Sequence, residues 1–459
     1  MALDVVILAA GKGTRMNSSL PKVLQLLGGK PLLRHVTDTA ALLGATRTHA
    51  VIGFGAEQIR EHYEQSGCEL PNWVIQKEQL GTGHAVQQAL PNLEGHSAGD
   101  SVLVLYGDVP LISVEVLQSL IEISAGEALA LLTVTTENPA GLGRIIRDAS
   151  GKILAIVEDK DASDQEKQIK EINSGIMAIP AKRIHDWLGR LDNNNKQGEY
   201  LLTDIVTMAV TDQCPVQSTV VADSLELLGV NDKTQLARLE RHYQMNKVDQ
   251  LLQGGVTVRD PQRVDIRGEL TCGKDVEIDV NVVFEGHVVL GEGARIGANC
   301  TIKDCEIGTN VEILPGCHME GGIIGKDSII GPQARIRPGT VLAEGVRIGN
   351  FVETKNASMG KGSKANHLAY IGDAEIGEGC NIGAGTIFCN YDGANKHKTT
   401  LGDNVFIGSN SVLVAPVSLA TNSFVAAGSA INVDVPADNL AIARGKQRNI
   451  SGWKRPTKK

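Results

Sequence analysis

Aromatic residues are scarce in this sequence, whereas glycine is abundant. Phenylalanine, tyrosine and tryptophan together make up 3% of the 459 residues, and glycine occurs 51 times. Hydrophobic residues still amount to 42%, so we expect interiors built from Val, Ile, Leu and Ala, with many tight turns. Because 459 residues exceed what one ordinary core organises, the length predicts two or three domains.

Several sequence features that would point to other classes of protein are also missing. The eight cysteines form no C-x-x-C pair, which argues against a zinc or redox motif. The net charge of −9 argues against a nucleic-acid partner or an anionic membrane surface. No apolar run reaches the ~18 residues of a membrane span, and the short run DVVILAA is unlike a signal peptide. We therefore expect a cytoplasmic chain with free thiols.

The first half of the chain alternates apolar runs with amphipathic stretches. VVILAA, HAVIGF, NWVIQ and SVLVLYGD are typical of buried strands, and KPLLRHVTDTAALLGA fits an amphipathic helix. Continuous apolar strands between helices predict an α/β domain over residues 1–233, with a mostly parallel sheet covered on both faces. Ligands of such sheets bind at the carboxyl ends of strands, where AAGKGTR and Asp108 fall.

Residues 234–253 carry apolar side chains at helical spacing, and Gly254 and Gly255 end the pattern. We interpret 234–254 as a helix that links two domains. The same pattern also fits the last helix of the first domain.

From about residue 264 onward, aliphatic residues recur every six positions. One run consists of Ile324, Ile330, Ile336, Leu342 and Ile348, and several of these are followed by glycine. This is the signature of a hexapeptide-repeat β-helix, in which each hexapeptide forms one flat side of a triangular coil and its aliphatic side chain stacks inward. We therefore assign 255–459 to a parallel β-helix with a C-terminal tail.

The six-residue period breaks between Ile348 and Ile376, and again between Ile382 and Leu401. Insertions in a solenoid project as loops from one face, often the binding face. The first break contains NFVETKNASMGKGSKANHLAYIG and the second contains FCNYDGANKHKTT. Both hold polar groups that a coil does not need, so we expect two loops that carry a binding site.

The loop AAGKGTR, with a lone lysine following it, suits a phosphate chain. Gly11 and Gly13 let a phosphate approach the backbone closely, and Lys12, Arg15 and Lys22 can offset its charge. A strand-to-helix turn with solvated basic residues is the competing interpretation.

Two further residues suggest a metal site near this loop. Asp108 closes a buried strand, where a carboxylate is well placed to hold Mg²⁺, and Asn231 can supply a second oxygen. Taken alone, each of them also fits a turn or a helix cap.

The motifs along the chain identify a family. LAAGKGTRM followed by LPK is similar to the opening signature of sugar-1-phosphate nucleotidyltransferases, and QLGTGHA, YGDVPL, GLGRI, IVEDKDA, EINSGI and GVND extend the match. Joined to the hexapeptide repeats, the chain resembles the bifunctional GlmU family over nearly all 459 residues. The resemblance implies a Rossmann-like nucleotidyltransferase domain joined by a helix to a left-handed β-helix. It also implies a homotrimer whose acetyl sites lie between neighbouring coils.

For the first domain, the resemblance implies uridylyl transfer from UTP to N-acetylglucosamine 1-phosphate. Arg15 and Lys22 would act on the phosphates, and Asp108 and Asn231 would coordinate Mg²⁺. The residues implied to contact UTP or the nucleotide sugar are Leu8, Ala9, Ala10, Gly11, Lys22, Gln76, Gly81, Thr82, Tyr106, Gly107, Asp108, Gly143, Glu158, Asn173 and Asn231.

A second chemistry is suggested by His367. Moving an acetyl group from a thioester to an amine benefits from a general base, because a sugar amine is largely protonated at pH 7. His367 is the candidate, since histidine as a residue type ordinarily titrates near that pH, and Glu353 could orient its imidazole. A solvated loop histidine is the competing interpretation when His367 is taken alone.

For the second domain, the resemblance implies N-acetylation of glucosamine 1-phosphate by acetyl-coenzyme A, with His367 as the base. The residues implied to hold the sugar phosphate are Arg337, Lys355, Tyr370, Asn381 and Lys396. Those implied to bind acetyl-coenzyme A are Ala384, Asn390, Tyr391, Ser409, Ala427 and Arg444. On the residues alone, the two alanines are ordinary coil packing.

These observations favour one chain with two reactions that together make UDP-N-acetylglucosamine. A single sugar-1-phosphate nucleotidyltransferase with a β-helix for oligomerisation or regulation is the alternative. A third hypothesis is that the chain is a binding or assembly protein without enzymatic activity. The polar residues of the two predicted insertions distinguish the first hypothesis, since a pure scaffold would not need them.

Overall fold

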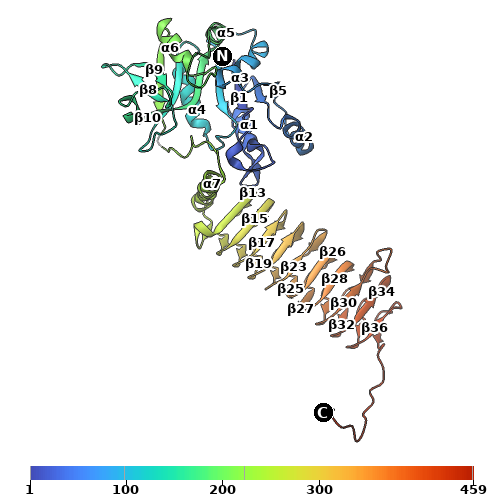
Figure 1. Ribbon diagram of the computed structural model, residues 1–459. Helices are drawn as coiled ribbons and strands as arrows, with labels where there is room; N and C mark the ends of the chain where they lie inside the picture. The colour runs from blue at the N-terminus through green and yellow to red at the C-terminus, as the bar shows by residue number, and fades with distance from the viewer. Residues whose placement is uncertain (1, 98, 222, 457, 459) are drawn as a thin grey trace. The chain divides into compact units, whose positions relative to one another are not determined.

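The computed structural model describes residues 2–97, 99–221, 223–456 and 458 (Figure 1). The chain divides into two compact units between Tyr243 and Gln244. The helices are α1 (Leu32–Leu42), α2 (Ala56–Ser66), α3 (Thr82–Ala89), α4 (Val114–Ser124), α5 (Ala181–Gly189), α6 (Asp204–Thr211) and α7 (Lys233–Gln253). No helix in the described part of the chain is both long and apolar enough to cross a membrane.

The first unit is built on one mixed sheet. Its strands are β1 (Leu3–Ala9), β4 (Arg47–Ile52), β5 (Asn72–Ile75), β6 (Ser101–Tyr106), β7 (Leu129–Thr135), β8 (Arg144–Arg147), β9 (Ile153–Val157), β10 (Glu171–Pro180) and β11 (Val216–Val220), beside a small pair, β2 (Leu26–Leu27) and β3 (Lys30–Pro31). The order across the sheet is β11-β7-β10-β6-β1-β4-β5.

Helices cover both faces of this sheet, as the continuous apolar runs predicted (Figure 1). Val6 and Leu8 of β1 pack into a core shared with α3, α5 and α6. The alternate residues Val5 and Ile7 pack on the other face, with α1, α2 and α4. The pairs among β1, β4, β5 and β6 are parallel, whereas β10 runs antiparallel between β6 and β7. The chain reaches β10 through the β8–β9 hairpin rather than through a crossover helix, so the strand direction reverses there.

The second unit is a parallel coil of short strands. These are β12 (Thr257–Val258), β13 (Val264–Cys272), β14 (Glu277–Ile278), β15 (Val282–Leu290), β16 (Arg295–Ile296), β17 (Thr301–Lys303), β18 (Glu306–Ile307), β19 (Glu312–Ile313), β20 (His318–Glu320), β21 (Gly322–Ile324), β22 (Ile329–Ile330), β23 (Arg335–Ile336), β24 (Thr340–Leu342), β25 (Arg347–Asn350), β26 (Glu353–Met359), β27 (Lys364–His367), β28 (Tyr370–Ile376), β29 (Asn381–Ile382), β30 (Ile387–Cys389), β31 (Thr399–Leu401), β32 (Phe406–Ile407), β33 (Val412–Val414), β34 (Val417–Leu419), β35 (Phe424–Val425), β36 (Ala430–Ile431) and β37 (Leu440–Ala441).

The six-residue period explains the core of this coil. Ile296, Ile313, Ile330 and Ile348 pair with one another on successive turns, 17 or 18 residues apart, and all are buried. Three hexapeptides make such a turn, so each inward aliphatic residue stacks on its equivalent above and below. The stacked residues form one continuous core, as the predicted hexapeptide-repeat β-helix requires.

The first predicted insertion, between Ile348 and Ile376, is wrong. Ile348 pairs with Ala365, and Ala365 pairs with Ile382, so the chain completes an ordinary turn through this stretch. Thr354 fills another inward position, where its hydroxyl lies 3.1 Å from that of the buried Thr340. Alanine and threonine occupy two of the inward positions here, so the aliphatic period is interrupted although the coil continues.

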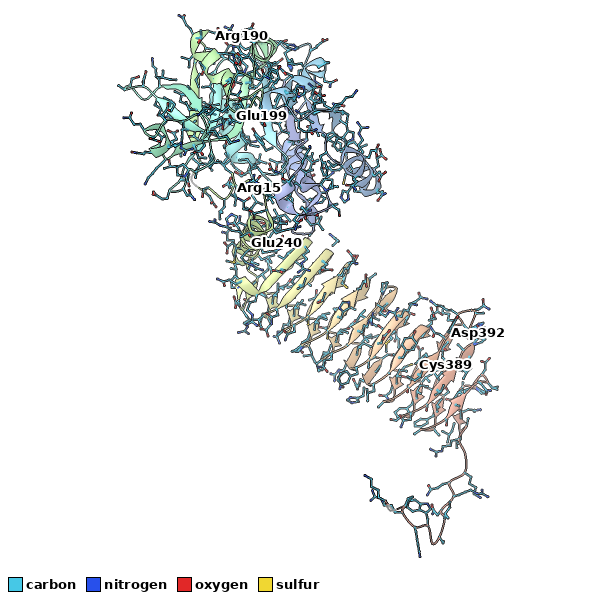
Figure 2. All side chains as sticks on the ribbon, in the orientation of Figure 1. Arg15, Arg190, Glu199, Glu240, Cys389 and Asp392 are labelled. Atoms are coloured by element: carbon cyan, nitrogen blue, oxygen red, sulfur yellow. The ribbon has the colours of Figure 1, made fainter. Side chains whose placement is uncertain are left out.

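The second predicted insertion is present. Ile376 pairs with Leu401, 25 residues further on, instead of with a residue 17 or 18 away. The extra residues leave the coil after β30 and return at β31. In this loop, Asp392 accepts hydrogen bonds from the amides of Ala394 and Asn395 and from His397, which order the projection (Figure 2).

Helix α7 spans the division between the two units, which lies within it. The assignment of 234–254 as a separate linker, and the domain limits drawn from it, stay predictions.

Candidate active sites

A hollow of about 390 Å³ opens at the carboxyl ends of β1 and β6. These strands are neighbours in the middle of the sheet, so their last residues, Ala9 and Tyr106, reach the same place. The hollow is lined by Leu8, Ala9, Ala10, Gly11, Lys22, Val23, Gln76, Gln79, Gly81, Thr82, Ala85, Tyr106, Asp108, Glu199 and Asn231.

Most residues predicted for the first site line this hollow. Those predicted that do not line it are Arg15, Gly107, Gly143, Glu158 and Asn173. Four lining residues were not predicted: Val23, Gln79, Ala85 and Glu199. The first three adjoin or lie within the LPK and QLGTGHA motifs, which could have indicated them. Glu199 stands in a loop before α6, where no motif marks it (Figure 2).

The glycine-rich loop brings a lysine against the backbone. Gly13 has a φ of 58°, and a Cβ at this position would lie 2.7 Å from the Cβ of Lys22. Only a residue without a side chain fits both the left-handed backbone and this contact. The stem of Lys22 therefore lies against the glycine-rich loop.

Two oxygens converge on the ammonium of Lys22. Asp108 accepts a hydrogen bond from it, and the Oδ1 of Asn231 lies 3.5 Å from its Nζ. Arg15 also reaches this oxygen, with its Nη2 at 3.3 Å from Asn231 Oδ1. The backbone carbonyl of Asp108 accepts from the amide of Val230 at 2.9 Å, which brings the GVND segment to the end of β6. Residues from three segments that are distant in the sequence thus meet at the ammonium of Lys22.

This donor set suits a divalent cation. A carboxylate and an amide oxygen already hold one cationic group, and Mg²⁺ commonly takes one or two protein oxygens plus water and phosphate. Among the described residues, no group of three or more His, Cys, Asp and Glu side chains is placed to hold a metal. Asp108 and Asn231 therefore fit a metal shared with a phosphate ligand rather than one enclosed by protein.

The amide of Gln76 also lines the hollow. Its Nε2 donates to the carbonyl of Gly81 at 3.2 Å and lies 3.1 Å from Nδ1 of His84. The bond to Gly81 orients the amide, and its oxygen accepts no hydrogen bond from a described residue, which leaves it for a ligand. His84 was missed by the prediction, although it belongs to QLGTGHA.

Gly143, Glu158 and Asn173 lie together beyond the hollow. The amide of Asn173 donates to the carbonyl of Gly143 at 2.9 Å, and a Cβ on Gly143 would lie 3.4 Å from Oε1 of Glu158. The Oδ1 of Asn173 is buried without a hydrogen-bond partner in the described structure. Because such a group is costly to leave unpaired, it marks a place where a polar ligand would bind.

Burial shapes the acid–base behaviour of this region. It raises the pKa of Glu158, and it raises the pKa of Tyr106, with nearby Asp108 and Glu158 adding to the effect. Burial, with the charges of Asp192 and Glu158, raises the pKa of Asp204 to about 6. Glu158 and Asp204 therefore retain protons more readily than exposed carboxyl groups do.

In the second unit, three predicted cations gather on the coil. Contact with the ammonium of Lys396, and then the charge of Arg337, lowers the pKa of Lys355. Arg337 also donates to Oε1 of Glu353 at 2.7 Å. A cluster of cations that repel one another would bind a doubly charged phosphate well. Asn381 is not brought into this cluster, since it lies on β29 opposite Lys364 and Phe406.

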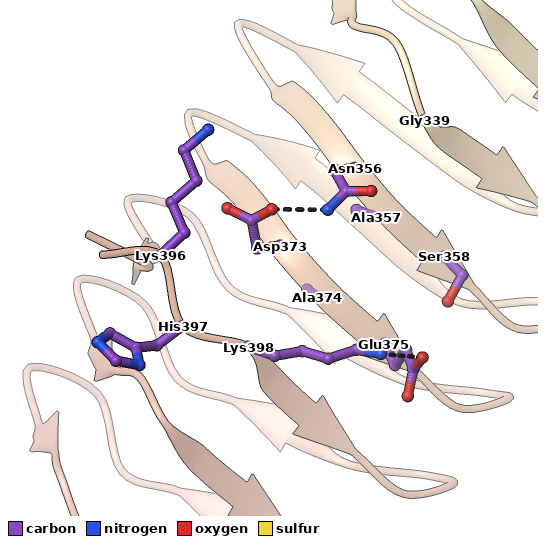
Figure 3. Close-up of a pocket in the computed structure, with 10 residues that line it drawn as sticks. All are labelled: Gly339, Asn356, Ala357, Ser358, Asp373, Ala374, Glu375, Lys396, His397 and Lys398. Atoms are coloured by element: carbon purple, nitrogen blue, oxygen red, sulfur yellow. Dashed lines mark hydrogen bonds and ion pairs between the residues drawn. The ribbon is translucent and has the colours of Figure 1, made fainter. Parts of the chain in front are cut away.

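A cavity of about 360 Å³ is lined by Lys396 of this cluster and by Asp373 (Figure 3). Asp373 accepts from Asn356 at 2.7 Å and is also hydrogen-bonded by Asn390, whose amide lies 3.4 Å from the hydroxyl of Tyr370. Burial alone would raise the pKa of Asp373, but these hydrogen bonds and the charges of Lys396 and Lys355 hold it below its usual value. Asp373 thus holds the predicted residue Asn390 beside Tyr370, and no motif indicated it.

His367 is exposed at the end of β27, and its ring has a partner that differs from the prediction. Nδ1 lies 3.0 Å from Oδ1 of Asn350, the residue opposite it on β25. Glu353, predicted to orient the ring, bonds Arg337 instead. The register explains this, because Glu353 stands opposite Tyr370 rather than His367.

Three of the residues predicted for acetyl-coenzyme A form a stripe along the coil. Ala384, Ser409 and Ala427 each follow by two positions the stacked residues Ile382, Ile407 and Val425. The guanidinium of Arg444 donates to the carbonyl of Ala427 at 2.7 Å, at the end of the stripe. Tyr391 is exposed on the inserted loop, with its hydroxyl bonded to the carbonyl of Gly393.

Comparison with known families agrees with the two units. Residues 5–172 match the MobA-like NTP transferase domain. Residues 266–358 match the GMPPB C-terminal domain, and residues 398–432 match the hexapeptide repeat of succinyl-transferase.

Curated relatives match the chain from end to end. It is 55% identical over 459 residues, the whole of both chains, to the bifunctional protein GlmU of Stutzerimonas stutzeri (strain A1501). It is 55% identical over 458 residues to that of Pseudomonas entomophila (strain L48), covering 100% of this chain and 99% of the relative. It is 54% identical over 457 residues to that of Azoarcus sp. (strain BH72), covering 99% and 100%. With two units, two clusters of charged residues and this full-length identity, the chain belongs to the GlmU family of bifunctional proteins.

Proposed function

We propose that the chain catalyses two successive reactions on one amino sugar phosphate. The second unit acetylates glucosamine 1-phosphate with acetyl-coenzyme A. The first unit then transfers a uridylyl group from UTP to N-acetylglucosamine 1-phosphate and releases pyrophosphate. The product is UDP-N-acetylglucosamine, a precursor of cell-envelope polymers. One observation carries the proposal: a chain that matches bifunctional GlmU proteins throughout holds a separate cation cluster in each unit.

Uridylyl transfer requires positioning and charge neutralisation rather than a protein nucleophile. A phosphate oxygen of the sugar attacks the α-phosphorus of UTP, and the bond from that phosphorus to the pyrophosphate oxygen breaks. Lys22 and Arg15 offset the negative charge on the phosphates as it shifts toward the leaving group. Asp108 and Asn231 hold Mg²⁺, which when bound adds to this neutralisation.

The rest of the first site selects the two substrates. The backbone of Leu8–Gly11, together with Gly81 and Thr82, lies against the nucleotide, and the oxygen of Gln76 accepts a hydrogen bond from uracil. Tyr106 and Gly107 line the sugar side. Gly143, Glu158 and Asn173 bind the N-acetylhexosamine, and the unpartnered Oδ1 of Asn173 supports this assignment.

Acetyl transfer takes place along the coil. His367 removes a proton from the sugar ammonium, the amine attacks the thioester carbonyl, and the carbon–sulfur bond breaks to release the thiol of coenzyme A. Arg337, Lys355, Tyr370 and Lys396 hold the sugar phosphate. Asn381, which lies outside their cluster, contacts the same ligand from β29. The small residues Ala384 and Ala427 leave room for the pantetheine arm, while Asn390, Tyr391, Ser409 and Arg444 supply polar contacts.

We further propose that the chain works as a cytoplasmic homotrimer assembled through the β-helix, with acetyl sites between neighbouring coils. Exposed apolar residues on the coil support an association of this kind. Phe406 and Phe424 stack with ring centroids 4.4 Å apart, and Leu440 continues the row on β37.

A paired assay on the full chain tests the proposed function. Thiol release is measured with acetyl-coenzyme A and glucosamine 1-phosphate, and pyrophosphate release with UTP and N-acetylglucosamine 1-phosphate. We expect His367→Ala to abolish the first and spare the second, and Asp108→Asn to do the reverse. Wild-type protein that releases pyrophosphate but no thiol would be a nucleotidyltransferase with a β-helix used only for assembly or regulation.

A further inference from the structure

Asn350 and His367 occupy the same position on two successive turns of the coil. β25 and β27 pair in parallel, and their register sets Asn350 directly opposite His367. Each of these residues is followed by one with a left-handed backbone, Phe351 with a φ of 58° and Leu368 with a φ of 46°. The same local turn therefore presents both side chains, and it brings Oδ1 of Asn350 to 3.0 Å from Nδ1 of His367.

This contact determines which nitrogen of the imidazole carries the proton. A carbonyl oxygen has no hydrogen to give, so Nδ1 of His367 must donate to Oδ1 of Asn350. A neutral imidazole has one N–H, so the lone pair then lies on Nε2. In the described structure no group hydrogen-bonds Nε2. That nitrogen is the one left to accept a proton from a substrate.

The charges around His367 suit a base that is neutral before it acts. Its hydrogen-bond partner is an uncharged amide, and the charged residues on β25 and β27 are the cations Arg347 and Lys364. The Glu353 carboxylate, on the next strand, is bonded to Arg337. A carboxylate partner would favour the charged imidazolium, whereas an amide orients the ring without adding a charge.

We propose that Asn350 is a positioning residue for acetyl transfer, which fixes the tautomer of His367 with Nδ1 protonated and Nε2 free. The proposal rests on the proposed function of the second unit. Asn350 then has the orienting role that was predicted for Glu353.

Kinetics of two variants test this role. Asn350→Ala frees the ring and its tautomer, so kcat for thiol release should fall about 10- to 100-fold. Asn350→Asp keeps an acceptor oxygen and adds a negative charge. The fall in rate at low pH, the acid limb of the pH profile, should therefore move upward by about one pH unit. At pH values above this limb, the rate of Asn350→Asp should be within about threefold of wild type. Pyrophosphate release by the same protein should change less than about twofold in both.

Asn366→Ala is the matched control. Asn366 precedes His367 on β27, is exposed, and its side chain hydrogen-bonds no described residue. It should release thiol at a rate within about twofold of wild type. Asn350→Ala with an unchanged kcat, or Asn350→Asp with an unmoved acid limb, would overturn the proposal.

A second readout does not depend on turnover. In the full-length protein labelled with ¹⁵N-histidine, the resonances of His367 are assigned by their loss in His367→Gln. We expect Nδ1 to have the shift of a protonated nitrogen and Nε2 that of a bare one, with the difference reduced in Asn350→Ala. The opposite tautomer in wild type would refute the proposal even if acetyl transfer were normal. Absence of thiol release would instead refute the proposed function.

Discussion

Gly81→Ala should disable uridylyl transfer and spare acetyl transfer. Gly81 has a φ of 118° and a ψ of 174°, a conformation that is nearly exclusive to glycine. A Cβ there would lie 2.4 Å from the backbone oxygen of Tyr200. Tyr200 cannot move away freely, because its amide donates to Leu80 and its carbonyl accepts from Gly83, both at 2.8 Å.

The size of the effect follows from this geometry. Carbon and carbonyl oxygen approach to about 3.3 Å at closest, so the 2.4 Å contact requires a displacement of about 1 Å. The backbone strain adds about 1–3 kcal/mol. Gly81 also accepts the hydrogen bond that orients Gln76, so the displacement would reach the ligand. Since misplacement by about 1 Å can cost about 100-fold in rate, we expect a loss of that order in kcat/KM for UTP.

The assay is pyrophosphate release, with thiol release from the same preparation as the internal control. Gly151→Ala is the matched variant, because Gly151 has a φ of 86° but a Cβ added to it would have no atom within 4 Å. Gly151→Ala introduces the backbone strain of a positive φ but no steric contact, so it should change uridylyl transfer less than about twofold. If Gly81→Ala kept its rate within about threefold of wild type and left the KM for UTP unchanged, the reasoning from this contact would be refuted.

Three further outcomes are expected. EDTA, or Asp108→Asn, should lower uridylyl transfer at least about 100-fold and leave thiol release nearly unchanged. The reason is that the two oxygens suited to Mg²⁺, those of Asp108 and Asn231, lie in the first site. Lys396→Ala should raise the KM for glucosamine 1-phosphate about tenfold. Because Lys396 lowers the pKa of Lys355, the loss of affinity with rising pH should also move to higher pH in this variant. Burial raises the pKa of Asp204 to about 6, so the folded chain holds a proton that the unfolded chain has lost. The first unit should therefore lose about 1–2 kcal/mol, after allowance for solvent screening, as pH rises from about 4 to about 6. Asp204→Asn should raise the melting temperature by a few degrees at about pH 8 but not at about pH 4.

Each of these has a contrary result. Uridylyl transfer that persists in EDTA would show that the first site needs no metal. For Lys396→Ala the control is Lys361→Ala, an exposed lysine paired with Glu344, and equal KM values in the two variants would contradict the phosphate cluster. A melting temperature of Asp204→Asn equal to that of wild type at about pH 8 would show that burial of this carboxyl group costs nothing.

The fold was largely predictable because its signals are local. A six-residue period indicates a coil whose neighbouring strands lie only 17 or 18 residues apart, so the pattern and the packing have nearly the same range. The prediction failed where an inward position was filled differently. Thr354 fills one inward position, where its hydroxyl is hydrogen-bonded to that of Thr340. The small Ala365 fills another, so the aliphatic period broke while the coil continued.

Residue types and their spacing were enough to indicate the two architectures, the family and the chemistry of the charged groups. Which of these groups meet depends on how the chain packs in three dimensions. Asp108 and Asn231 are far apart in the chain but converge on Lys22. His367 faces Asn350 rather than Glu353, because a register between turns selects one partner and no property of the side chains reveals that register. Asp373 gathers Asn356 and Asn390 from other turns for the same reason, and only packing in three dimensions fixes such contacts.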